Sequence, residues 1–254
     1  MTQRRPELMT ISDPEIRLTV AGQALRELPA EDCLDWLETQ GLSSATPPQD
    51  ARPAIIAIVR NLCRQPLSRA WWQSLGEAAD ARSRRDLVAL CTEVEESDQT
   101  RLRQTLDREL QEKTVGYRIS HARTANPSQL DRLIHDQEPR VIRSLLGNSK
   151  LTLQQVLRLV TRRPLIRPVV DELIDAPKWS QIYEVHRGLA RNDTVSHRVR
   201  LAHLLLLAPN DLHRLARDPM QSELARRAAR YRFIEGIESR EYPTPRLLEE
   251  RVFD

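Results

Sequence analysis

Arginine side chains gather at two places in the second half of the sequence, and their chemistry suits the binding of anionic groups. One cluster comprises Arg158, Arg162, Arg163 and Arg167, and the other comprises Arg226, Arg227, Arg230 and Arg232. A guanidinium group presents planar N–H donors that match the oxygens of carboxylates and phosphates. If helices stack in register, these residues line a basic ridge that suits an acidic protein surface, nucleic-acid phosphates or anionic lipid head groups. The alternative is that they bind carbonyl groups of neighbouring repeats or pair with the acidic N-terminal half.

The sequence contains no local pattern for catalysis or metal binding. His197 and His203 are six residues apart, about 240° around a helix, and so do not share a face. Neighbouring carboxylates project about 100° apart on a helix and form no acid–base pair by themselves; these pairs are Glu95–Glu96, Asp171–Glu172 and Glu249–Glu250. The seven glycines are too widely spaced for a phosphate-binding loop. We therefore predict no bound metal or cofactor and no enzymatic activity.

Two adjacent tryptophans, Trp71 and Trp72, are a second candidate contact with a partner. Both indoles cannot face one side of a helix, so one is expected to pack in the core and the other to be partly exposed. We take Trp72 as the candidate anchor for a partner, the alternative being that both pack between helices. Trp179 and Tyr183 are four residues apart after Pro177, a spacing that predicts a packed pair opening a helix.

The net charge of +3 is the sum of three unequal segments. Residues 1–112 carry −5, residues 113–232 carry +11 and residues 233–254 carry −3. We therefore predict an acidic N-terminal region with a loop at 41–52, a basic central region and an acidic tail. The tail offers apolar residues after Tyr242-Pro-Thr-Pro245, which suits a frayed end, a strap along the same chain or a docking peptide.

The composition favours a cytoplasmic location and no membrane span. The longest apolar run, Ala54 to Val59, is far shorter than the roughly 20 residues that a span requires. No apolar stretch follows the arginines near the N-terminus, so no secretory signal is predicted. The three cysteines, Cys33, Cys63 and Cys91, have no C-x-x-C spacing and sit among apolar neighbours, which predicts reduced thiols packed in the core.

Helices are the elements that must position all of these residues. Two Phe and four Tyr are few for a sheet protein, and apolar residues recur at helical spacing over 153–160, 169–174 and 201–208. Thr152 and Gln155 form a capping box ahead of the first of these stripes. Further helices are predicted over 16–28, 32–38, 53–63, 71–79, 84–94, 211–217 and 222–230. The N-terminal group, within 1–112, is irregular and is expected to form a cap or a small bundle.

The central region is similar to itself. A shift of 44 residues places Val141–Thr152 on Val185–Ser196, and so places Asn148 on Asn192. A shift of 22 residues places Asn148 on Asn126. We infer a repeating unit of about 22 residues in which an Asn or Asp takes a turn position that tolerates the left-handed conformation, or caps the next helix.

Three stretches in this region resemble the bacterial HEAT-like repeats, including the leucine-rich-repeat-variant type: Glu138–Arg143, Leu145–Thr152 and Leu189–Thr194. They share an acidic-Pro-x-Val-Arg opening, an apolar helix and an Asn-containing turn. The resemblance covers roughly residues 118–232. It implies an all-α fold, an α-solenoid of stacked short helical repeats, and such stacks commonly bind through their extended surface.

Two functions follow as hypotheses. The first is a non-enzymatic, cytoplasmic scaffold of bacterial type that binds a protein partner, expected to be acidic, through the Arg-rich surface. The alternative is a nucleic-acid-binding protein, because similar repeats cradle damaged DNA in one family of base-excision enzymes. That function requires a Trp and a carboxylate facing a basic groove, and Trp179 with Asp175 is the pair that we nominate.

Overall fold

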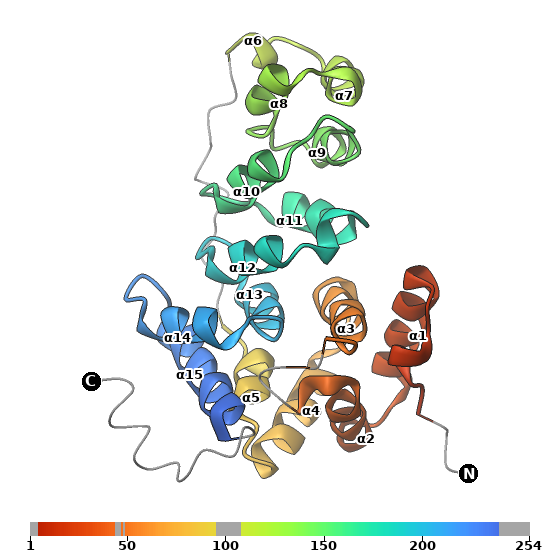
Figure 1. Ribbon diagram of the computed structural model, residues 1–254, viewed down its shortest axis with the longest axis vertical. Helices are drawn as coiled ribbons and strands as arrows, with labels where there is room; N and C mark the ends of the chain where they lie inside the picture. The colour runs from red at the N-terminus through yellow and green to blue at the C-terminus, as the bar shows by residue number, and fades with distance from the viewer. Residues whose placement is uncertain (1–4, 44–46, 48, 95–107, 239–254) are drawn as a thin grey trace. The chain divides into compact units, whose positions relative to one another are not determined.

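The computed structural model describes residues 5–43, 47, 49–94 and 108–238, which form helices and no strand (Figure 1). The all-α prediction is confirmed for this part of the chain. None of the helices in it is both long and apolar enough to cross a bilayer. The predicted tail lies outside the described residues from 239 onward, whereas residues 233–238 continue the last helix.

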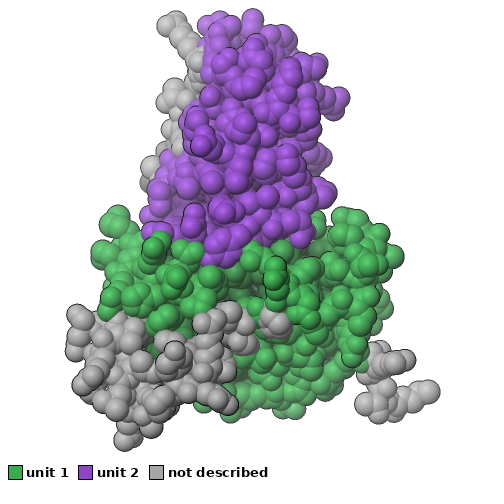
Figure 2. Space-filling model, in the orientation of Figure 1, with its two compact units in different colours: residues 1–94, 197–254 green, residues 95–196 purple. Residues whose placement is uncertain are grey.

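The chain divides into two compact units (Figure 2). Unit 1 combines residues 1–94 with residues 197–254, and unit 2 comprises residues 95–196. The boundaries expected from charge, at 112 and 232, each fall inside one of these units. Packing and charge therefore divide the chain differently.

Unit 1 is a bundle built from both ends of the chain. Its helices are α1 (Pro14–Glu27), α2 (Ala30–Leu37), α3 (Arg52–Arg64), α4 (Arg69–Ala81), α5 (Arg85–Cys91), α13 (His197–Leu204), α14 (Pro209–Arg217) and α15 (Glu223–Glu238), with short turns η1 (Leu8–Thr10) and η2 (Glu38–Leu42). Helix α13 packs against α3 and α5, and α15 packs against α5 and α14. The C-terminal helices thus complete a core that the N-terminal helices begin.

A buried ion pair joins the two parts of unit 1. Arg232 on α15 and Asp86 on α5 both have side chains that are 0% exposed, with Nη1 and Oδ2 3.1 Å apart. Arg84 donates to the same carboxylate, and its Nη2 lies 3.1 Å from Asp86 Oδ2. Burial raises the pKa of Asp86, but the charges of Arg232 and Arg84 outweigh it and hold that pKa below its usual value.

Unit 2 is built from short helices in two rows. They are α6 (Arg108–Gln111), α7 (Val115–Thr124), α8 (Pro127–Leu133), α9 (Pro139–Leu146), α10 (Leu153–Thr161), α11 (Arg167–Asp175) and α12 (Tyr183–Arg191), with a turn η4 (Trp179–Gln181). Helix α9 packs against both α7 and α11, and α10 packs against α12. In Figure 1, α7, α9 and α11 follow one side of the unit, and α8, α10 and α12 follow the other. The capping box that the sequence predicts at Thr152 and Gln155 is confirmed at the start of α10.

Asn148 and Asn192 make equivalent contacts. Each is buried, at 5% and 1% exposed, and each donates through Nδ2 to two carbonyls near the end of the helix two places earlier in the chain, α7 and α10 respectively. Each also accepts, at Oδ1, the backbone N–H two residues further on. Asn192 follows α12 with φ −83°, outside the left-handed region that its turn position was expected to tolerate, and its side chain caps an earlier helix rather than the next one.

Two other side chains make the same kind of contact. Arg162, after α10, donates through Nη1 to carbonyls just after α8 at 2.6 and 2.8 Å. Trp179, after α11, donates through Nε1 to Leu146 O at the end of α9, at 2.8 Å. Helix C-termini leave carbonyls without a partner inside the helix. Four successive helices, α7 to α10, therefore receive a donor from a residue within four positions after the helix two places later. We call these four donors, Asn148, Arg162, Trp179 and Asn192, the capping series.

Candidate partner-binding site

Three of the predicted contact residues, Arg158, Arg163 and Arg167, are exposed on unit 2 and form ion pairs with carboxylates at its surface. Arg158 lies 2.9 Å from Asp131, Arg163 lies 2.5 Å from Asp193, and Arg167 lies 2.8 Å from Asp171 one turn further along α11. Their side chains are 57%, 53% and 49% exposed, so solvent screens all three pairs. Each of these arginines therefore lies at the surface of unit 2 beside a carboxylate of the same unit.

Arg162, the fourth member of this cluster, is buried instead. It is 7% exposed, and Nη1 belongs to the capping series. Burial lowers its pKa to about 10, although the nearby Asp136 charge opposes this. The sequence could not separate Arg162 from its neighbour Arg163, because the carbonyls that Arg162 caps belong to residues 134 and 136, far from it in the sequence.

The second arginine cluster lies in unit 1, on α15. Arg226 pairs with Glu223 at 2.5 Å, and Arg227 lies 3.8 Å from the same carboxylate. Arg230 is exposed, whereas Arg232 is fully buried against Asp86. The two predicted clusters therefore belong to different units, and Arg162 and Arg232 are internal.

Trp72, the predicted aromatic anchor, is also internal to unit 1. It is 3% exposed, its ring meets Trp71 edge-on with centroids 5.0 Å apart, and the Arg198 guanidinium lies 4.3 Å from its ring centroid. Trp71 is half-buried. The expectation that one indole packs and the other is partly exposed is therefore confirmed, and Trp72 is the one that packs.

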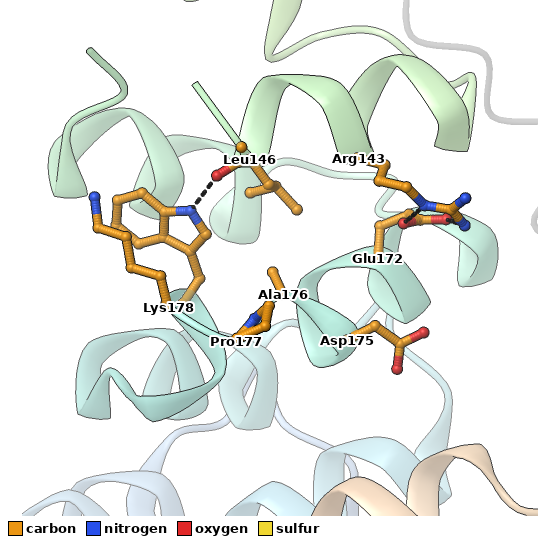
Figure 3. A pocket seen from close by; sticks show the side chains of 9 residues that line it. Arg143, Leu146, Glu172, Asp175, Ala176, Pro177 and Lys178 are labelled. Atoms are coloured by element: carbon orange, nitrogen blue, oxygen red, sulfur yellow. Dashed lines mark hydrogen bonds and ion pairs between the residues drawn. The ribbon is translucent and has the colours of Figure 1, made fainter. Parts of the chain in front are cut away.

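Unit 2 carries an open pocket of about 510 Å³ that the arginine pattern did not indicate (Figure 3). It lies where α9 and α11 end and where η4 begins. It is lined by Arg143, Leu146, Gly147, Glu172, Asp175, Ala176, Pro177, Lys178 and Trp179. Its volume falls within the range of about 300–1,000 Å³ that is usual for ligand sites.

The polar groups of this pocket are arranged around an apolar floor. Arg143 donates side-on to Glu172, with Nε 2.8 Å and Nη2 2.7 Å from the two carboxylate oxygens. The hydrogen bonds to Glu172 raise the pKa of Arg143, and the charges of Glu172 and Asp175 add to this effect. On the opposite side, Lys178 Nζ lies 4.2 Å from the centroid of the Trp179 ring, where a cation–π attraction operates.

The nominated pair, Trp179 and Asp175, does meet in one place, since both line the pocket. Trp179 is 2% exposed and its indole N–H is committed to Leu146 O. Figure 3 shows Asp175 on the rim, on the same side as Arg143 and Glu172. The pair was nominated for its residue types alone, and no sequence pattern placed Arg143 or Leu146 beside it.

Other candidate chemistry is dispersed in the described part of the chain. Asp171 and Glu172 bind different arginines, Arg167 and Arg143 respectively, while Glu95–Glu96 and Glu249–Glu250 lie outside the described residues. No group of three or more His, Cys, Asp or Glu within the described ranges is placed to hold a metal ion. Cys33, Cys63 and Cys91 are buried, as predicted, and none of these three forms a disulfide.

Comparison with protein-family models, with curated proteins and with solved structures finds no match to this chain.

Proposed function

We propose that the protein is a non-enzymatic scaffold of stacked, HEAT-like helical repeats that binds an acidic protein partner through unit 2. The capping series supports the repeat interpretation, because the same donor-to-carbonyl contact recurs at four successive helices. A stack of this kind presents an extended surface, and extended surfaces of stacked helices commonly bind other proteins.

The observation that carries the proposal is the placing of Arg158, Arg163 and Arg167. They are exposed at α10, at the turn that follows it and at the start of α11, and each is held by a carboxylate at the surface. Surface ion pairs contribute only about 0–1 kcal/mol. Carboxylates of a partner can therefore replace the present ones at little cost.

Charge reversal at these three residues tests the proposal. Arg162 is left unchanged because it is buried and structural. The full chain with Arg158→Glu, Arg163→Glu and Arg167→Glu is compared with the wild type as bait in cell lysate, across a range of salt concentrations. The matched control carries the same three changes at Arg226, Arg227 and Arg230 in unit 1.

We expect proteins that the wild type retains at low salt to be lost from the unit 2 variant and kept by the unit 1 variant. The retained proteins are expected to be acidic and to dissociate as salt rises, because screening weakens exposed charge pairs. Retention of the same proteins by the unit 2 variant would show that these arginines do not form the partner surface.

A nucleic-acid-binding function is the second candidate, because Trp179 and Asp175 line one pocket. A mixed-sequence duplex titrated across a salt series tests it, since each released counterion gives the affinity a slope against salt. Binding with such a slope, lost in the unit 2 variant, favours nucleic acid over an acidic protein. Absence of binding at low salt eliminates this candidate.

A further inference from the structure

The pocket at the ends of α9 and α11 is distinct from the arginine surface, and two of the hydrogen-bond acceptors that line it are already occupied. Glu172 is bound side-on by Arg143, and the carbonyl of Leu146 is bound by the indole N–H of Trp179. The face of the Trp179 ring is occupied by the ammonium group of Lys178. Glu172 and one face of the Trp179 ring, two places that could hold a cationic ligand, are therefore occupied by cations of the chain itself.

The groups that remain for an occupant are donors and apolar surface. The pairing of Arg143 with Glu172 uses Nε and Nη2, so Nη1 is left outside it, and the side chain is 71% exposed. Lys178 is exposed on the other side of the pocket. Between these two cations lie Leu146, Ala176 and Pro177 (Figure 3).

We propose that this pocket takes an apolar side chain from an acidic peptide segment of the protein partner. The apolar side chain packs against Leu146, Ala176 and Pro177, where it loses contact with water. Carboxylates that flank it in the peptide bind Arg143 at Nη1 and Lys178 at Nζ. A guanidinium bound side-on to one carboxylate has further N–H donors for a second one.

Charge complementarity selects this occupant over a basic peptide. Glu172 is only 10% exposed at its side chain and is bound by Arg143, so the exposed charged groups of the pocket lining are two cations, Arg143 and Lys178, and one carboxylate, Asp175. Asp175 on the rim opposes an acidic ligand and so limits the affinity, which makes it a useful position for a test. The proposal rests on the proposed function in that the peptide is taken to belong to the partner.

The test uses labelled peptides and the full chain, with binding measured by fluorescence anisotropy. The probe is an acetylated and amidated pentapeptide with phenylalanine between two pairs of glutamates. Three comparison peptides replace the phenylalanine by alanine, the glutamates by glutamines, or the glutamates by lysines. We expect the first peptide to bind and each comparison peptide to bind at least about tenfold more weakly, since each lacks the apolar anchor or the charges.

Point variants then locate the binding. Lys178→Gln is expected to weaken binding of the first peptide about threefold to fivefold, the effect of one exposed charge pair, whereas Lys150→Gln, which removes the same charge from a lysine outside the pocket lining, leaves it unchanged. Asp175→Asn is expected to tighten binding by a similar factor. Ala176→Trp, which fills the pocket, is expected to abolish binding, with Ala81→Trp at the exposed end of α4 as the steric control.

The proposal is overturned if the lysine-flanked peptide binds best, if Asp175→Asn weakens binding, or if the alanine peptide binds as tightly as the probe. Because Arg158, Arg163 and Arg167 do not line the pocket, their triple variant is expected to retain the peptide. Loss of lysate proteins from that triple variant, together with no peptide binding by the wild type, would leave the arginine surface standing and remove the pocket. Peptide binding by the wild type, together with no arginine-dependent partner from lysate, would support the pocket and remove the arginine surface.

Discussion

Replacing Asp86 by Asn is expected to destabilise the protein strongly through unit 1. The change keeps the size of the side chain and removes the charge between Arg232 and Arg84. Because Asp86 and Arg232 are both 0% exposed, water cannot solvate the arginine left behind. Removing one partner of such a buried pair costs about 3–5 kcal/mol, a large fraction of the roughly 5–15 kcal/mol that keeps a domain folded.

Urea unfolding followed by circular dichroism measures this cost, and Asp35 supplies a matched control. Asp35 also binds two arginines, Arg5 and Arg82, but its side chain is 37% exposed. Asp35→Asn is therefore expected to cost only a small fraction of the Asp86→Asn value, since solvent screens the pair. If the two variants unfold at the same urea concentration, the argument from burial is wrong.

The same ion pair predicts how stability depends on pH. The folded-state pKa of Asp86 is lowered, so its contribution is complete above the unfolded-state pKa of about 3.9 and is lost as pH falls through the lower folded-state value. Wild-type stability is thus expected to fall more steeply than that of Asp86→Asn below about pH 4. Parallel acid-unfolding curves for the two proteins would contradict this assignment.

Three further predictions concern other contacts. Gly188→Ala is expected to lower the melting temperature, because the added Cβ would lie 2.5 Å from Val160 Cγ1. Adding Val160→Ala should recover part of the loss, and an unchanged melting temperature in Gly188→Ala refutes the close approach. Asn192→Ala is expected to cost about 2–3 kcal/mol in urea unfolding, since two buried carbonyls lose their donor, against about 1 kcal/mol for the exposed helix cap Asn126→Ala. Burial lowers the pKa of His197, so stability should decline as pH falls below the unfolded-state value of about 6.5; His197→Gln should flatten that decline in urea titrations at successive pH values, and an unchanged slope argues against it.

Local patterns in the sequence were sufficient to predict many of the helices. The apolar stripe over 153–160 corresponds to α10, and the capping box at Thr152 lies at its first turn because both signals act within a few residues. The stripe over 201–208 extends beyond α13, whose last residue is Leu204. Leu205 to Leu207 lie in the turn that follows and are also buried. The apolar pattern therefore marks buried residues beyond the end of the helix.

Contacts between residues distant in the sequence were not predictable in this way. Asp86 and Arg232 are 146 residues apart, and neither stands out from the other charged residues near it in the sequence. The pocket is likewise formed from two separate stretches, 143–147 and 172–179. The self-similarity did predict that Asn148 and Asn192 are equivalent, but the carbonyls that they bind lie in helices two places earlier in the chain.

The division of unit 1 between the two ends of the chain has a consequence for synthesis. Residues 95–196 are synthesised before α15, so unit 2 can begin to fold while Asp86 still has no Arg232 to bind. During that interval the N-terminal helices of unit 1 lack the core contacts that α13 to α15 supply. A nascent chain stalled before residue 232 should therefore protect unit 2 from protease while α5 remains open to cleavage.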